Sequence, residues 1–136
     1  MLPFLDINVI LRHITQDDPV QGARSYQLLQ QLATGALEAT TCEAVILEAV
    51  FVLSSKTLYN LPRDQIRDAI TSFVSLQGLK IPNKRVYIRA LELYASSNLD
   101  FADTVIVAHM ERIGSKEVIS FDQHFDRVPG ITRREP

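Results

Sequence analysis

The amino-acid sequence predicts an α/β protein whose parallel sheet is covered by helices on both faces. Short apolar segments typical of buried strands alternate with longer segments that have helical apolar spacing. The strand-like segments 2–6 and 117–121 each bring an acidic residue to the carboxyl end of a strand. The composition, 46% hydrophobic and 22% charged with only five glycines and six prolines, is that of a compact globular protein.

A chain of 136 residues is long enough to bury one core, so we expect a single domain over residues 1–136. The net charge of −2 excludes proteins that coat a duplex with a broad basic face. The single Cys42 excludes an internal disulfide and fits a reducing compartment. No signal peptide precedes Asp6, and the longest apolar run, 44–53, is shorter than the roughly 20 residues that cross a bilayer. We therefore expect a cytoplasmic protein without a membrane segment.

The first predicted elements are a buried strand over residues 2–6 and a short helix over 8–13. Two acids followed by proline at 17–19 predict the N-cap and first position of a second helix. That helix continues to about Ala33, because Gly35 is a helix-stopping residue. Asp6 would then stand at the carboxyl end of the first strand.

The segment 37–41 is a plausible second strand, and Thr41 is predicted to cap a helix over 42–56. Nearly every residue of that helix is apolar, although Glu48 stands in its middle. A helix that is apolar all round is buried on more than one side, against the sheet and against a second copy of the protein. The sequence therefore favours a homodimer.

The second half of the chain continues the alternation of helices and strands. We expect helices from 61 to Gly78, over 83–97 and over 100–114, and strands over 79–81, over 117–121 and near 131. Ligands in such folds collect outside the carboxyl ends of the strands. Asp6 and Asp122 fall there, and Asp103, in the first turn of its helix, could join them.

Four carboxylates of this chain have no evident use in packing. An isolated carboxylate in apolar surroundings is costly unless it is paired, protonated or bound to a cation. Oxygen ligands suit Mg²⁺ or Mn²⁺, and no cysteine and histidine cluster has the spacing of a zinc site. Such ions activate water and offset the charge of a phosphodiester, which points to hydrolysis of a nucleic-acid backbone. The four acids are Asp6, Glu48, Asp103 and Asp122.

Each acid also has a simpler interpretation. Asp6 and Asp100 could cap the helices that follow them, and Asp122 could start a turn before His124. Glu48 could form a buried ion pair with an arginine. The three histidines are scattered, so each is expected to be a surface or packing residue.

Taken together, four short motifs of this sequence resemble the PIN domain, particularly its VapC-like toxin ribonucleases. Their order and spacing agree with that family, and the resemblance covers nearly the whole chain. The motifs are Asp6-x-Asn8, Leu47-Glu48, Asp100-Phe101-x-Asp103 and Ser120-Phe121-Asp122-x-x-Phe125.

The resemblance implies a three-layer α/β/α sandwich with a mostly parallel five-stranded sheet. It also implies a Mg²⁺- or Mn²⁺-dependent endoribonuclease, the toxin of a type II toxin–antitoxin pair, which commonly forms a homodimer held by a cognate antitoxin. By position, four acids match the catalytic and metal-binding acids of the family, the last being its more variable one: Asp6, Glu48, Asp103 and Asp122.

Other residues near these acids are expected to assist. Asn8 matches a polar residue that supports the first acid, and Asp100 has at most a supporting role. Arg12, close behind the first acid, could reach an RNA phosphate, as could the arginines near the C-terminus. The sequence departs from the family at Ile7, where threonine or serine is common, and at Thr104, where alanine is common.

Several functions compete with the toxin. One is an RNA-processing nuclease without toxicity, and another is a non-catalytic PIN-like module used for binding or dimerisation. Haloacid-dehalogenase-like phosphatases and receiver domains also have an aspartate after the first strand. The former need a second aspartate where Asn8 stands, and the latter need a further acidic pair near the N-terminus that this sequence lacks.

Overall fold

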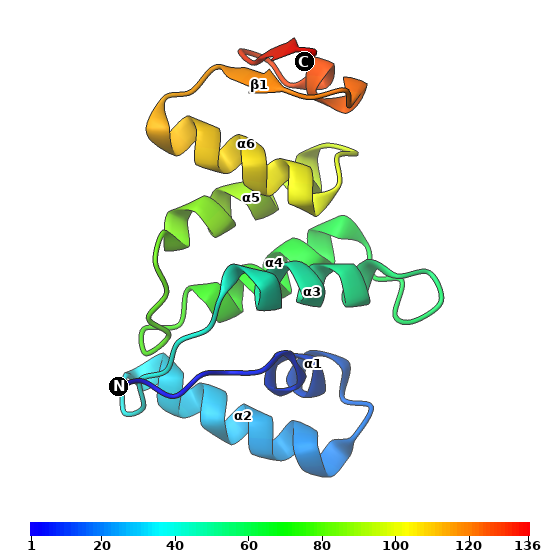
Figure 1. The fold of residues 1–136 in the computed structure, drawn as a ribbon. Helices are drawn as coiled ribbons and strands as arrows, with labels where there is room; N and C mark the ends of the chain where they lie inside the picture. Colours follow the sequence, from blue (N-terminus) through cyan, green and yellow to red (C-terminus); the bar gives the residue numbers. More distant parts are fainter. The chain divides into compact units, whose positions relative to one another are not determined.

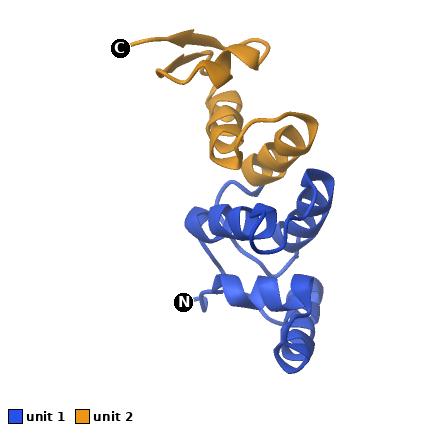
Figure 2. Ribbon diagram, turned by 90° about the vertical axis from the view of Figure 1, so that its right-hand side faces the viewer, with its two compact units in different colours: residues 1–84 blue, residues 85–136 orange.

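The computed structural model describes residues 1–136, which form six α-helices, one 3₁₀-helix and two short strands. The chain divides into two compact units, unit 1 over residues 1–84 and unit 2 over residues 85–136 (Figure 2). Helices and parallel strands together confirm the predicted α/β class. None of the helices is both long and apolar enough to cross a membrane.

Unit 1 contains four helices (Figure 1). Helix α1 packs on α2 and α3, and α3 packs on α4. The most deeply buried side chains of this unit come from all four helices and from the segment after α4, and include Ile10, Leu32, Leu53, Ile66 and Leu79. The helices are α1 (Ile7–Thr15), α2 (Pro19–Thr34), α3 (Glu43–Ser54) and α4 (Arg63–Val74).

The predicted start and stop signals of α2 are confirmed. The Asp18 carboxylate accepts a hydrogen bond from the Gln21 amide at 3.0 Å, and Pro19 occupies the first position of the helix. Gly35 ends the helix with φ of 79°, a left-handed conformation that glycine adopts without strain.

The predicted cap of α3 is wrong. The N-cap is Cys42, and the Thr41 hydroxyl instead donates to the Leu5 carbonyl at 2.9 Å. This bond is buried and joins two extended segments, so it satisfies a carbonyl that water does not reach.

Within a single chain helix α3 is buried along one stripe, and its predicted contact with a second copy stays a prediction. Ile46, Ala49, Val50 and Leu53 are buried, whereas Phe51 keeps 71% of its surface exposed. One apolar stripe of the helix packs against α1 and α4. The helix has more apolar residues than this stripe contains, so the others remain on its outer side.

Helix α4 ends at Val74, before the predicted stop at Gly78. The Gly78 amide donates to the Leu32 carbonyl at 2.7 Å, and the Gly78 carbonyl accepts from the Ala39 amide at 2.9 Å. The amide and the carbonyl of Gly78 are therefore both bonded to neighbouring segments and are not available for the hydrogen bonds of a helix.

Three extended segments of unit 1 lie side by side as parallel neighbours, with bridges between Phe4 and Thr40 and between Ala39 and Leu79. Backbone hydrogen bonds of 2.8 to 2.9 Å hold them, such as Leu5 amide to Thr40 carbonyl and Thr40 amide to Pro3 carbonyl. The three predicted strands of this half of the chain are thus present as short parallel bridges. Each is shorter than the pattern suggested.

Unit 2 contains two helices followed by a pair of short strands. The Arg89 guanidinium and the Glu111 carboxylate join the two helices, with a shortest distance of 2.9 Å between Nε and Oε2. The rings of Tyr94 and Phe101 meet edge to face with centroids 5.7 Å apart. The elements are α5 (Lys84–Ser96), α6 (Phe101–Ile113), β1 (Glu117–Ile119), the 3₁₀-helix η1 (Gln123–Arg127) and β2 (Thr132–Arg134).

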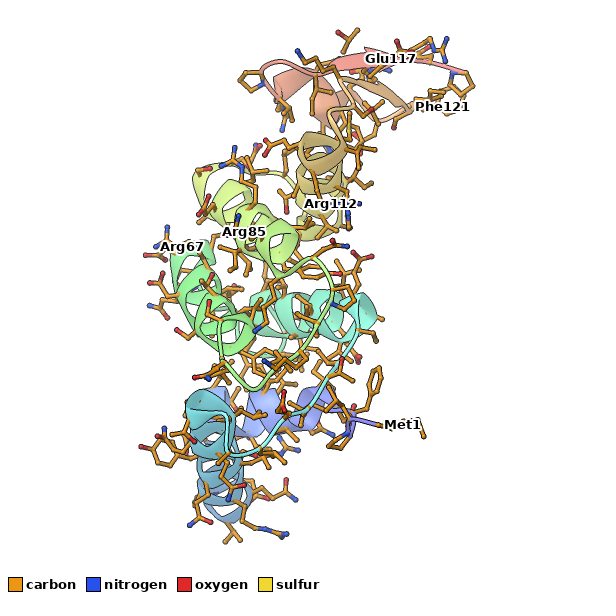
Figure 3. The ribbon with its side chains drawn as sticks, turned by 90° about the vertical axis from the view of Figure 1, so that its left-hand side faces the viewer. Met1, Arg67, Arg85, Arg112, Glu117 and Phe121 are labelled. Carbon is orange, nitrogen blue, oxygen red and sulfur yellow. The ribbon has the colours of Figure 1, made fainter.

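Strands β1 and β2 are parallel, with Val118 opposite Arg133. They confirm the two predicted strands of this half of the chain. Figure 3 shows Glu117 at the start of β1 and the Phe121 side chain beyond its end, where Phe121 is 73% exposed. Ile119, the last residue of β1, is also exposed, at 58%.

Candidate metal centre

Three side chains of unit 2 converge into a group that could hold a metal ion. Asp103, Asp122 and His124 each offer one ligand atom, and these atoms lie within 4.8 Å of one another. Asp103 belongs to the first turn of α6, Asp122 precedes η1, and His124 lies within η1. Two carboxylates and an imidazole at such separations are within reach of a single cation.

Local hydrogen bonds fix Asp122 and His124. The Asp122 carboxylate caps η1 by accepting from the His124 amide at 2.9 Å, and Nδ1 of His124 lies 3.1 Å from the same oxygen. The Ser120 hydroxyl accepts from the Asp122 amide at 2.9 Å. The simple interpretation of Asp122 as a turn former is therefore confirmed, and its second oxygen has no hydrogen bond or ion pair.

Asp103 is placed by the start of α6. Asp100 occupies the N-cap with extended backbone but makes no capping hydrogen bond through its side chain. Phe101 and Thr104 are buried, and the Thr104 hydroxyl donates to the Phe101 carbonyl at 2.8 Å. This anchoring leaves Asp103 half-buried on the side of the helix that meets Asp122.

The electrostatics of the group favour a bound cation. Partial burial raises the pKa of Asp103 above its usual value, and the negative charges of Asp122 and Asp100 raise the pKa further, while His124 lowers it. Like charges held this close repel each other, and a divalent cation between them would remove the repulsion. The donor set therefore fits an ion such as Mg²⁺ or Mn²⁺.

The two remaining predicted acids belong to unit 1. Asp6 is the N-cap residue of α1, yet its exposed side chain accepts no capping hydrogen bond. Glu48 is exposed on α3 and forms no ion pair. The simple interpretations of helix capping for Asp6 and of a buried arginine pair for Glu48 are therefore both wrong. Asn8, in the first turn of α1, is exposed as well.

The structure thus brings Asp103 and Asp122 together, as the sequence predicted, and adds His124 to them. A common site for all four acids stays a prediction. The sequence analysis missed His124 because an isolated histidine has no metal-site spacing. The available signal was its position two residues after an acid in a predicted turn.

The arginines near the C-terminus have structural partners. Arg133, with 12% of its side chain exposed, lies 3.0 Å from Asp126 and 3.1 Å from Glu135, and also donates to the Ser120 carbonyl at 3.1 Å. Arg134 lies 2.8 Å from Glu117. Their guanidinium groups therefore stabilise the two-stranded sheet and its neighbours.

A family model of the PIN domain matches residues 4–131, a span that contains all four predicted acids. The chain belongs to the PIN domain family. PIN domains are generally nucleases, usually metal-dependent, and their acidic clusters are consistent with the group in unit 2. No curated protein sequence matches this PIN domain.

Proposed function

We propose that this PIN domain protein is a divalent-metal-dependent endoribonuclease and, more narrowly, the VapC-like toxin of a type II toxin–antitoxin pair. The observation that carries the proposal is the convergence of Asp103 and Asp122 in a chain of a nuclease family. Paired carboxylates with a raised pKa at one of them are a frequent sign of a functional site.

In this proposal four acids hold the ion, and Asn8 and Asp100 support them. The exposed and unpaired state of Asp6 and Glu48 supports their inclusion, because neither carboxylate has another role. When bound, a divalent ion supplies an activated water and offsets negative charge on the phosphodiester. The ligands are Asp6, Glu48, Asp103 and Asp122, with His124 beside Asp122.

The protein's own groups then have distinct tasks. Asp103 and Asp122 must be deprotonated to hold a cation, and Asp122 keeps its orientation through the amide of His124. The attack on phosphorus needs no covalent intermediate, because a water activated by the ion would add to phosphorus directly. The bond between phosphorus and one ester oxygen breaks as water adds.

We also propose that the parallel segments form one five-stranded sheet of an α/β/α sandwich. The first segment of unit 1 and strand β1 of unit 2 each have one edge that pairs with a neighbouring segment. Each also has exposed apolar residues, with Phe4 at 66% and Ile119 at 58%. A parallel sheet buries both faces, so pairing of these two edges would cover them and place Asp6 and Asp122 at one end of the sheet.

The deciding experiment is cleavage of total cellular RNA by the purified protein in Mg²⁺ or Mn²⁺. We expect cleavage that a chelator abolishes. Asp103→Asn should lower the cleavage rate at least about a hundredfold, because even a residue that only orients a metal ligand can change activity by about that factor. Asp68→Asn is the matched control, because the Asp68 side chain is 71% exposed and its carboxylate contacts only Arg67. Metal-dependent binding without any cleavage would favour the non-catalytic module.

The toxin role has a separate test. Expression of the protein should arrest growth, and a small partner protein encoded beside it should relieve the arrest. Growth that continues despite metal-dependent cleavage in vitro would favour the RNA-processing nuclease. Homodimerisation is proposed as well, and the exposed Phe51 on α3 supports an apolar contact between copies. Sedimentation at several concentrations would measure it.

A further inference from the structure

A depression of about 360 Å³ lies on the surface of unit 1 where α1 and α2 pack together. Two arginines line it, Arg12 from α1 and Arg24 from α2, and Asn8 lies at the α1 side. No acidic side chain lines it. Asn8 is two residues beyond Asp6, so the depression adjoins the start of the helix that carries the first proposed ligand.

Helices α1 and α2 are tightly packed next to the depression. Gly22 is buried, and a Cβ atom added there would lie 3.0 Å from the Arg12 carbonyl oxygen. The two helices therefore approach each other closely at this point, which fixes the spacing of the side chains that project from them.

Arg12 is held in one orientation. Its Nε donates to the Gln21 side chain at 2.9 Å, and its Nη1 donates to Asp17 at 3.1 Å. Asp17 is itself fixed by the hydroxyls of Tyr59 and Thr15, at 2.5 and 2.9 Å. The Nη2 group of Arg12 has no partner, so a pre-oriented donor of a planar guanidinium remains available.

Arg24 is the uncompensated charge of this surface. It is exposed and takes part in no hydrogen bond or ion pair. The exposed Arg89 and Arg134 differ from it, since both contact carboxylates. Arg12 is oriented by its ion pair with Asp17, and Arg24 beside it has no acid to face, so the two guanidinium groups together suit a group that carries negative charge.

We propose that this depression binds a backbone phosphate of the RNA, with Arg24 and Arg12 as donors. The inference rests on the proposed ribonuclease function and adds a subsite that holds the substrate by its backbone. Phosphate contacts position a nucleic acid without reading its bases, so the subsite acts equally on different sequences. Arg24 contributes binding energy and has no part in the chemical step.

The test is RNA binding by the full chain in EDTA, where metal-dependent cleavage is absent. The probes are two single-stranded RNA oligonucleotides of unrelated sequence, titrated by fluorescence anisotropy between about 50 and 300 mM KCl. Arg24→Ala should weaken binding and reduce the slope of log K against log salt by about 0.7, the value for one lost phosphate contact on a single strand. The reduction should be equal for both RNAs.

Arg112→Ala is the matched control, because Arg112, in the last turn of α6 (Figure 3), is also exposed and without a partner. It should leave the slope unchanged, and Arg24→Lys should retain most of it. Equal slopes for Arg24→Ala and the unmodified protein would overturn the subsite. Absence of RNA binding by the unmodified protein would contradict the proposed ribonuclease itself, so the two failures are distinguishable.

Discussion

The two units hold their acids in opposite ways. In unit 2 Asp103 and Asp122 are already close, and partial burial, followed by repulsion from Asp122, raises the pKa of Asp103. In unit 1 Asp6 and Glu48 are exposed single carboxylates without partners. The difference shows that a local turn can bring two possible ligands together, since Asp122 and its hydrogen-bonded neighbour His124 need only Asp103 from α6 to complete the candidate group.

The units also differ in how tightly their glycines are enclosed. A Cβ atom at Gly78 of unit 1 would lie 2.1 Å from the Leu37 carbonyl oxygen and 2.8 Å from the Leu32 carbonyl oxygen, both backbone atoms. At Gly114 of unit 2 the space is open, and only its φ of 76° disfavours a side chain. We therefore expect Gly78→Ala to lower the free energy of unfolding by about 3 kcal/mol and Gly114→Ala by about 1 kcal/mol.

Urea denaturation followed by circular dichroism measures both losses. Equal losses would show that the backbone of the extended segments in unit 1 gives way easily, which would contradict its tight packing. The difference in free energy of unfolding between the two glycine variants does not depend on a metal, so it should be the same in the presence of a chelator.

Metal affinity tests whether the two sets of acids act together. If all four carboxylates hold one ion, then Asp6→Asn, Glu48→Gln and Asp122→Asn should each weaken Mn²⁺ binding at least about tenfold, or about 1.4 kcal/mol. Titration calorimetry gives the three affinities, with Asp68→Asn as the control. A loss confined to Asp122→Asn would restrict the ion to unit 2 and would leave Asp6 and Glu48 without a role.

The imidazole of His124 allows a finer comparison between ions. Imidazole nitrogen favours Zn²⁺, whereas Mg²⁺ prefers oxygen. If His124 contributes a ligand atom, His124→Ala should weaken Zn²⁺ binding about fivefold and change Mg²⁺ binding little. Equal weakening for both ions would assign His124 to the support of Asp122, whose oxygen lies 3.1 Å from its Nδ1.

Much of this architecture could be predicted because it depends on local signals. The cap at Asp18, the proline after it and the stop at Gly35 specified α2 closely. The wrong predictions, the cap of α3 and the end of α4, concern residues whose tertiary hydrogen bonds determine their conformation. Thr41 donates to Leu5, and the backbone of Gly78 bonds to α2 and to residue 39. No periodicity reveals such long-range partners.

The candidate site shows the same division. The sequence predicted Asp103 and Asp122, whose motifs identify them, and missed His124, because its closeness to Asp122 depends on the turn of η1. It also could not show that Arg133 is taken by Asp126 and Glu135 whereas Arg24 stays free. Which arginines are available depends on side-chain partners, and these follow from the fold.

The smallest predicted effect contrasts two aspartates whose pKa values move in opposite directions. The hydrogen bond from Tyr59, followed by that from Thr15, lowers the pKa of Asp17, whereas burial raises that of Asp103. Tyr59→Phe should therefore raise the pKa of Asp17 toward its ordinary value of about 3.9, which NMR titration of the carboxyl carbon measures.

The same substitution should change the pH dependence of stability. A carboxyl whose pKa is lowered by folding stabilises the protein at pH values above its unfolded pKa, and this stabilisation is lost as pH falls through the folded pKa. The variant should consequently lose stability relative to the unmodified protein near neutral pH and converge with it in acid. An unchanged pKa would show that Tyr59 does not fix Asp17, and the orientation of Arg12 would then depend on Gln21 alone.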